Sequence, residues 1–239
     1  MPFWAYLVGI PCFGLLILVH EAGHYLAARW NGIAVAEFAI GWGPRIWGFE
    51  AGGTVWNLRA IPLGGYVRWH EEGAQAFAQA PVRARFWALV SGPLANLLLT
   101  WLALLVLFGP VLGWGWAAVP MSLKIIGMQT SEWLTAIGGL FHGAGVNLQG
   151  PVGIAHMAAQ QAALGPEQLL FFASFLSLNL ALFNLLPFPA LDGGRLCFLG
   201  LERIRRQALD PHVEGWIHAG GFLLMMLLAL ATTVKDLLA

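Results

Sequence analysis

The stretch His20-Glu-Ala-Gly-His24 decides how the rest of this sequence is interpreted. Residues four apart lie on the same face of a helix, so the imidazoles of His20 and His24 can bind one ion. Two neutral imidazoles suit zinc, and Glu21, about 100° further round the helix, can reach a metal-bound water as a general base. The HExxH pattern therefore predicts a zinc site, although it also occurs by chance in about one chain in a hundred of this length.

The residues before the motif make it more informative. Residues 3–19 contain no charged side chain, so the motif lies at the end of an apolar run of membrane-spanning length. A carboxylate and two imidazoles in such a place are costly unless something binds them. This position favours a functional site over a chance match.

The composition indicates an integral membrane protein. Of the 239 residues, 59% are hydrophobic and only 10% are charged, whereas a soluble domain carries about 25% charged residues. The net charge is zero, which gives no indication of nucleic acid as a partner. The two cysteines, Cys12 and Cys197, show no paired framework, so we expect them to pack and not to form a disulfide.

Four segments are apolar and long enough, at about 20 residues, to cross a bilayer. They cover residues 3–28, 86–108, 168–189 and 216–234. We therefore expect an all-α polytopic membrane protein, with four transmembrane helices, that forms a single domain over residues 1–239.

The basic residues predict the orientation of these spans. Ten of the twelve lie either between the first and second spans or between the third and fourth. The positive-inside rule places both of these loops in the cytoplasm and both termini outside it. The HExxH motif then lies in the cytoplasmic part of the first span.

The segment 33–69 predicts a β-hairpin between the first two spans. It is rich in Gly, Trp and β-branched residues, and Gly52-Gly53 separates two short extended runs, 45–49 and 54–60. Adjacent glycines supply the positive φ that a tight hairpin turn needs. Non-helical backbone near a membrane must be buried in protein or line a wet cavity. Few charges and several Trp and Ile residues favour a membrane-associated hairpin over an ordinary cytoplasmic loop.

The external connection, residues 109–167, predicts amphipathic structure without a further core. Apolar residues at helical spacing over 121–141 favour a helix lying in the membrane interface, and Pro151 begins a second short helix running to about residue 163. His142 and His156 are interpreted as surface histidines.

The third span ends in a second polar motif, Asn-Leu-Leu-Pro-Phe-Pro-Ala-Leu-Asp-Gly-Gly at 184–194. Its two prolines break the helix, and we expect Gly193-Gly194 to loosen the chain beyond them. Asp192 lies three residues before Arg195 of the predicted cytoplasmic loop, so its depth roughly matches that of His24. Two histidines and one carboxylate would make a zinc site with an open fourth position.

Five motifs occur in an order that resembles the site-2 protease family of intramembrane zinc metalloproteases. They are HEAGH at 20–24, PLGGYV at 62–67, SGPLAN at 91–96, QGPVGIA at 149–155 and NLLPFPALDGG at 184–194. The chain is similar to the bacterial branch that cleaves membrane-bound anti-sigma factors. We expect it to depart from that branch in lacking the PDZ domains usually found between the second and third spans, and to lack the cytoplasmic CBS tail of another branch.

The resemblance implies roles for individual residues. His20, His24 and Asp192 would bind Zn²⁺, and Glu21 would activate the water. Asn184 matches an asparagine that steadies the substrate backbone, and the hairpin matches one that pairs with an unwound substrate. Further candidates for substrate binding are Gly64, Gly65, Tyr66 and Asn96, although a buried asparagine such as Asn96 more often only packs helices together.

Two functions of different classes are compatible with these residues. The first is a zinc-dependent intramembrane endopeptidase of the bacterial inner membrane. It would cleave the transmembrane segment of a single-span protein, of the anti-sigma factor or signal-peptide remnant type, in regulated intramembrane proteolysis. The alternative is a non-catalytic membrane protein that binds or transports metal, or binds a partner helix. A transporter should show inverted repeats and polar groups along a path, whereas here the polar groups cluster at one depth.

Overall fold

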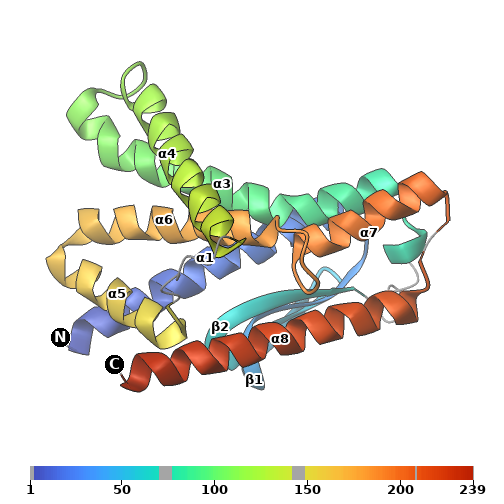
Figure 1. The fold of residues 1–239 in the computed structure, drawn as a ribbon. Helices are drawn as coiled ribbons and strands as arrows, with labels where there is room; N and C mark the ends of the chain where they lie inside the picture. Colours follow the sequence, from blue (N-terminus) through green and yellow to red (C-terminus); the bar gives the residue numbers. More distant parts are fainter. Residues whose placement is uncertain (1–2, 70–76, 142–148, 208, 239) are drawn as a thin grey trace. The chain divides into compact units, whose positions relative to one another are not determined.

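The computed structural model describes residues 3–69, 77–141, 149–207 and 209–238, most of which are helical. The elements, in chain order, are α1 (Phe3–Trp30), β1 (Val35–Ala51), β2 (Thr54–Trp69), α3 (Val82–Leu112), α4 (Ala118–Phe141), α5 (Pro151–Leu164), α6 (Pro166–Asn184), α7 (Asp192–Arg205) and α8 (Pro211–Leu238) (Figure 1).

Four of these helices are long and apolar enough to cross a membrane, which confirms the predicted number. They cover Trp4–Trp30, Val82–Leu112, Pro166–Asn184 and His212–Leu238. On α8 the side chains of Leu223, Leu227 and Leu230 are more than half exposed. Large apolar side chains exposed along a helix of this length suit contact with lipid.

Two predictions near the third span were wrong. The helix α6 ends at Asn184 and not at residue 189, because the prolines after it cannot continue a helix. Gly193 and Gly194 do not loosen the chain, since they lie in the first turn of α7. A β-carbon on Gly193 would lie 2.2 Å from the carbonyl oxygen of Leu186, so the glycines allow the helix start to pack closely on the preceding loop.

The described chain forms two compact units. The helical unit comprises Met1–Phe13, Leu97–Leu182 and Met225–Ala239, and the hairpin unit comprises Gly14–Asn96 and Phe183–Leu224. The helices α1, α3, α6 and α8 each contribute residues to both units. The residues of both polar motifs belong to the hairpin unit.

The hairpin unit contains the predicted β-hairpin, with strands longer than expected. The strands β1 and β2 pair antiparallel, and the turn between them uses Gly52 and Gly53 at φ +61° and +74°. Phe49 of the outer half of β1 pairs with Trp56, whereas Phe38 of the inner half pairs with both Trp56 and Val67. The inner half of β1 therefore pairs with both halves of β2.

A small apolar core joins this hairpin to the helices. Its buried members come from the end of α1, the connection that follows it, the start of β1 and the first part of α3: Ala28, Ile33, Val35, Ala84 and Ala88. Away from the core, Ile46 and Trp47 of β1 are 66% and 60% exposed. One end of the hairpin is thus anchored between helices, and the other presents large apolar side chains.

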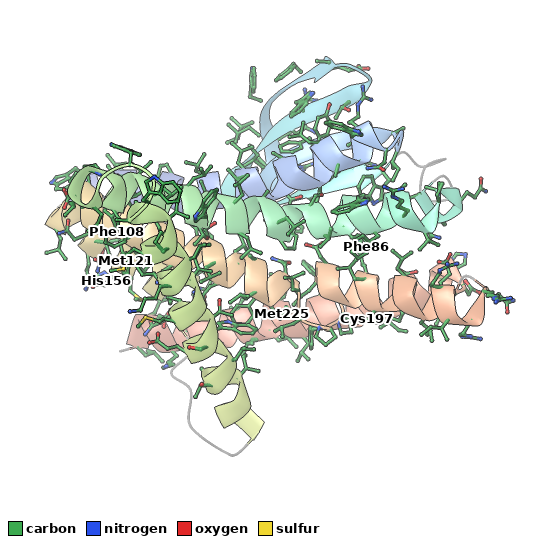
Figure 2. The ribbon with its side chains drawn as sticks, turned by 90° about the horizontal axis from the view of Figure 1, so that it is seen from above. Phe86, Phe108, Met121, His156, Cys197 and Met225 are labelled. Atoms are coloured by element: carbon green, nitrogen blue, oxygen red, sulfur yellow. The ribbon has the colours of Figure 1, made fainter. Side chains whose placement is uncertain are left out.

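The helical unit includes both helices predicted in the external connection. The helix α4 carries exposed apolar side chains, among them Met121, and His156 of α5 is exposed as predicted (Figure 2). The hydroxyl of Tyr6 lies 2.8 Å from Nδ1 of His156. His142 lies outside the described residues.

Both cysteines are free thiols, as predicted. Cys12 is half-buried in α1, in keeping with a packing role. Cys197 is exposed on α7 (Figure 2). The prediction that Cys197 is a packing residue was therefore wrong, because α7 turns this side chain outward.

Candidate metal centre

Three side chains of the hairpin unit converge on one point. His20 and His24 are four residues apart on α1, and Asp192 is the first residue of α7. The Nε2 atoms of the two imidazoles are 3.1 Å apart, and each lies 3.2 Å from Oδ2 of Asp192. Both histidines are buried. The polar atoms thus form a nearly equilateral triangle inside protein.

The dimensions of this triangle suit zinc. A tetrahedral ion with bonds of about 2.0–2.1 Å separates its ligand atoms by about 3.3–3.4 Å. The observed edges are within about 0.3 Å of that separation. Nδ1 of His24 lies 2.8 Å from the carbonyl oxygen of Ala88, to which an Nδ1–H donates. That hydrogen bond leaves the Nε2 lone pair directed at the centre, the arrangement found in metal-binding histidines.

Gly92 of α3 provides the surface against which His24 packs. A β-carbon at position 92 would lie 2.3 Å from Nε2 of His24, and one on Gly23 would lie 2.4 Å from the carbonyl oxygen of Ser91. The SGPLAN motif therefore lets α3 approach α1 closely at the centre. Sequence analysis did not anticipate the contact of this motif with a candidate ligand.

Asn96 lies four residues beyond Gly92, hence on the same face of α3. Its side chain is fully buried. Asn184, the other predicted substrate-binding asparagine, is the last residue of α6 and is half-buried. Roles for both asparagines stay predictions.

Gly65 brings the hairpin against Glu21. A β-carbon on Gly65 would lie 2.9 Å from Cγ of Glu21 and 3.0 Å from both Cγ2 of Ile17 and the carbonyl oxygen of Ala39. The backbone of β2 thus packs directly on the face of α1 that carries Glu21, one residue from His20. Gly64, at φ +96°, packs against the indole of Trp42. Of these two glycines, Gly65 therefore contacts the HExxH motif, whereas Gly64 contacts Trp42 of β1.

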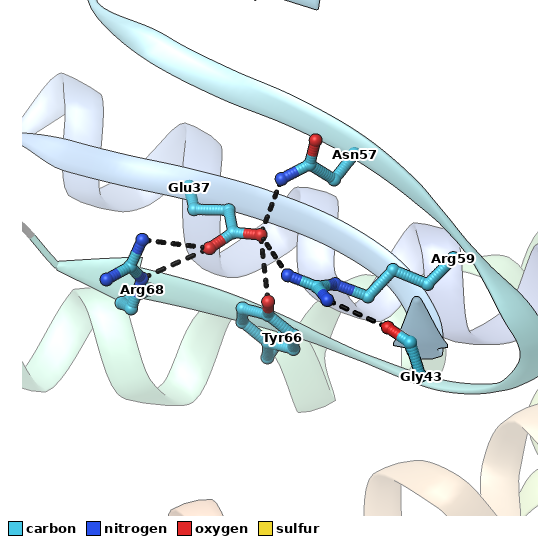
Figure 3. A network of polar contacts seen from close by, with 6 residues as sticks. All are labelled: Glu37, Gly43, Asn57, Arg59, Tyr66 and Arg68. Carbon is cyan, nitrogen blue, oxygen red and sulfur yellow. Dashed lines mark hydrogen bonds and ion pairs between the residues drawn. The ribbon is translucent and has the colours of Figure 1, made fainter. Parts of the chain in front are cut away.

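Tyr66 belongs to a polar network that holds the hairpin together (Figure 3). Its hydroxyl donates to Oε1 of Glu37 at 2.8 Å, and the same oxygen accepts from Asn57 at 2.6 Å and from Arg59 at 2.7 Å. Oε2 accepts from Nε and Nη2 of Arg68 at 3.1 and 3.0 Å. We predicted a substrate contact for Tyr66, but in this structure its hydroxyl binds Glu37.

The network stabilises the ionised form of Glu37, whose side chain is only 6% exposed. Burial by itself would raise the pKa of this carboxyl. The hydrogen bonds from Arg59, Asn57 and Tyr66 outweigh burial and lower the pKa to about 2. Sequence reasoning missed Glu37; an acidic residue in the otherwise apolar run 35–42 was the available signal.

A second polar contact fixes α7, the helix that carries Asp192. Arg85 at the start of α3 forms a two-pronged ion pair with Glu202, in which Nη1 lies 2.8 Å from Oε2 and Nη2 contacts Oε1. Nε of Arg85 also donates to the carbonyl oxygen of Ala80 at 3.0 Å. Paired planar groups of this kind hold one orientation, so the contact restrains α7 relative to α3.

Comparison with known proteins agrees with this geometry. Residues 8–228 match the sequence model described as peptidase family M50. The chain belongs to peptidase family M50. This M50 peptidase is 29% identical to a Clostridium perfringens protein assigned the name zinc metalloprotease, over 95% of this chain and 96% of the relative. It is 24% identical to the zinc metalloprotease RasP of Geobacillus kaustophilus, again over 95% and 96% of the two chains.

Family membership supports the resemblance to site-2 proteases drawn from the motifs. The M50 peptidase is a zinc metalloendopeptidase, and Zn²⁺ is its cofactor. Its alignments with these relatives extend over 326 and 406 positions. Both exceed the 239 residues of this chain, so the relatives contain residues without a counterpart here.

Proposed function

We propose that this M50 peptidase hydrolyses a peptide bond within the transmembrane segment of a single-span membrane protein. The observation that carries the proposal is the convergence of two histidines and one aspartate at a candidate membrane span, α1. A substrate of the anti-sigma factor or signal-peptide remnant type fits, because both present one apolar helix. Residues 1–239 would act as a single transmembrane metalloprotease domain.

The proposed chemistry divides between four side chains. His20, His24 and Asp192 hold the ion, leaving one coordination position open. Bound zinc supplies a Lewis acid that polarises the scissile carbonyl and lowers the pKa of water to about 7. Glu21, adjacent to His20 on α1, takes the proton of the attacking water and later gives it to the leaving amine. Cγ of Glu21 lies beside Gly65, so this side chain is next to the hairpin backbone.

Substrate binding is proposed along the hairpin edge near Gly65. A transmembrane helix hides its backbone in internal hydrogen bonds, so it must unwind before cleavage. In the described residues, β2 pairs only with β1, and the inner half of β1 already has neighbours on both sides. An extended substrate can therefore add as a strand beside residues 65–69. Gly65 and Tyr66 lie on this edge and Gly64 directly precedes it. Asn184 and Asn96 are proposed as further backbone contacts.

We also propose the placement in the membrane. The arginine distribution supports a bacterial inner-membrane protein with both termini outside the cytoplasm and the centre near the cytoplasmic side. The exposed Ile46 and Trp47 support a hairpin that dips into the bilayer interface. The lipid bilayer and a membrane-bound substrate are then the partners.

Cleavage of defined substrates tests the proposal. The detergent-solubilised chain is incubated with a panel of single-span peptides, with and without a chelator, and after zinc is restored. We expect cuts inside the apolar segment that chelation abolishes and zinc restores. Full zinc occupancy without any cleavage across the panel would instead favour the metal-handling alternative, for which Glu21 has no role.

A further inference from the structure

The backbone just before Asp192 adopts an unusual conformation. Ala190 has φ +79°, one of two positive φ values among the described residues other than glycine. This region of φ brings the β-carbon of an L residue close to its own backbone, and such residues adopt it rarely. A residue held there needs support from its surroundings. The support for Ala190 comes from α8.

His218 of α8 supplies a hydrogen bond to this backbone. The N–H of Ala190 donates to Nδ1 of His218 at 2.9 Å. His218 is part-buried, and its ring stands edge-on to Phe198 of α7 at a centroid distance of 5.4 Å. The imidazole thus contacts the loop before Asp192 and the helix after it.

The same face of α8 packs on the loop at a second point. A β-carbon on Gly221, three residues after His218, would lie 2.5 Å from both Cβ and the carbonyl oxygen of Pro189. The loop therefore rests directly on the α8 backbone at this position. Close packing at Gly221 and the hydrogen bond from Ala190 locate two consecutive loop residues, 189 and 190.

Glu214 favours the ring state that this hydrogen bond requires. Because Nδ1 accepts from Ala190, the hydrogen of a neutral His218 is on Nε2. Oε1 of Glu214, one turn earlier on α8, lies 3.7 Å from Nε2. A carboxylate at that distance attracts the N–H end of the ring and so favours a lone pair on Nδ1.

We propose that His218 is a positioning residue of the metal centre. By holding Ala190 in its positive-φ conformation, it directs the carboxylate of Asp192 toward His20 and His24. The assignment rests on the proposed role of Asp192 as a metal ligand. His218 contacts neither the ion nor the substrate in this account, and it acts only through the loop.

Substitutions at position 218 separate the hydrogen bond from packing. His218→Phe keeps an aromatic ring beside Phe198 but removes the acceptor. His218→Asn keeps an acceptor, since its Oδ1 occupies nearly the position of Nδ1. His218→Gln carries its acceptor one carbon further out, where it cannot replace Nδ1. His212→Phe, a change at an exposed histidine of the same helix, is the matched control.

The readouts are zinc affinity, measured by competition with a chromophoric chelator, and the Tm of the zinc-free protein. We expect His218→Phe and His218→Gln to weaken zinc binding about 10–100-fold, as loss of outer contacts of metal sites typically does. His218→Asn and His212→Phe should stay within about threefold of wild type. The zinc-free Tm should be similar for all variants that fold.

Wild-type zinc affinity in folded His218→Phe would overturn the proposal, and so would equal losses in His218→Asn and His218→Gln. If His218→Phe does not fold, the comparison of Asn with Gln decides. Asp192→Ala is measured alongside. Unchanged zinc binding in Asp192→Ala would refute the proposed ligand set, whereas loss there with wild-type affinity in His218→Gln would refute only the role of His218.

Discussion

Gly92 of α3 faces His24 of α1 so closely that a β-carbon at position 92 would come within 2.3 Å of Nε2 of the imidazole. That nitrogen is also one corner of the triangle formed with His20 and Asp192. The packing of α3 on α1 therefore also determines where this candidate zinc ligand lies. Substitution of Gly92, which has no side chain that could bind a metal, should therefore alter metal binding.

Gly92→Ala should reduce zinc binding. The added methyl group can be accommodated only if the His24 ring moves or α3 shifts away from α1. We expect bound zinc to fall well below one equivalent, by metal analysis of the purified protein. Gly200→Ala on α7 is the control, because a β-carbon there meets no atom within 4 Å and alanine stabilises a helix interior by about 0.5–1 kcal/mol. Equal zinc in both variants would mean that the ring has room to adjust.

Glu21→Gln should abolish cleavage while leaving zinc bound. Glutamine keeps the size of the side chain but cannot accept the proton of water, and Glu21 is not one of the three converging residues. Loss of a general base typically lowers the rate by about 10²–10⁴-fold. Single-turnover cleavage and zinc content measure the two effects. Near-wild-type turnover by the zinc-loaded variant would exclude Glu21 as the base.

Gly65→Ala should impair cleavage without removing zinc. Its methyl group would press on Glu21 and on the carbonyl oxygen of Ala39, displacing either the carboxylate or the hairpin edge. A misplacement of about 1 Å at a reacting group can lower the rate about 100-fold. Zinc content and cleavage rate are measured for both glycine variants. Gly92→Ala should lose zinc, whereas Gly65→Ala should keep its zinc and lose only turnover. Normal kinetics in Gly65→Ala would show that the hairpin edge is not part of the reacting site.

The Glu37 network should make the hairpin sensitive to acid. The pKa of Glu37 is about 2 in the folded chain, below its ordinary value of 4.5. A lowered pKa means that the carboxylate stabilises the fold fully above pH 4.5, and that this stabilisation is lost as the pH falls toward 2. Thermal unfolding of the wild type should therefore shift to lower temperature over this range.

Glu37→Gln should already be destabilised at pH 7, by roughly 1.5–3 kcal/mol, since charge-assisted hydrogen bonds are lost. Its unfolding should depend less on pH below 4.5 than that of the wild type. Glu50→Gln, a change at an exposed glutamate of the same hairpin, is the matched control. Identical acid profiles for wild type and Glu37→Gln would exclude Glu37 as the source.

Both termini should face away from the cytoplasm. Ten basic residues lie in the two predicted internal loops, whereas Lys124 is the only one in the external connection. A reporter that is active only after export, fused after residue 239, should therefore be active. A cytoplasmic signal there would mean either that a span has been miscounted or that the orientation is inverted, and only inversion would place the centre on the other side.

The sequence by itself determined the features that depend on local pattern. Four apolar runs predicted four candidate spans, because helix length and bilayer thickness alone decide that property. Gly52-Gly53 predicted the hairpin turn, since only the local φ requirement selects those residues. His20 and His24 are four residues apart, so helix geometry likewise predicts that they lie on the same face. Asp192 was predicted as the third ligand because its depth in the membrane roughly matches that of His24 and because of the family resemblance. The structure places it beside both imidazoles.

Only the tertiary structure decided which backbone surfaces surround these side chains. Gly92 against His24, Gly65 against Glu21, and Ala190 against His218 are contacts between residues far apart in the chain. In nearly uniform apolar helices no periodic polar face indicates which side meets which neighbour. Glycine in such a helix is compatible with lipid contact and with close packing alike. The local sequence does not distinguish the faces of such a helix. Which residue each glycine contacts is therefore decided by the long-range contacts that pack the whole unit.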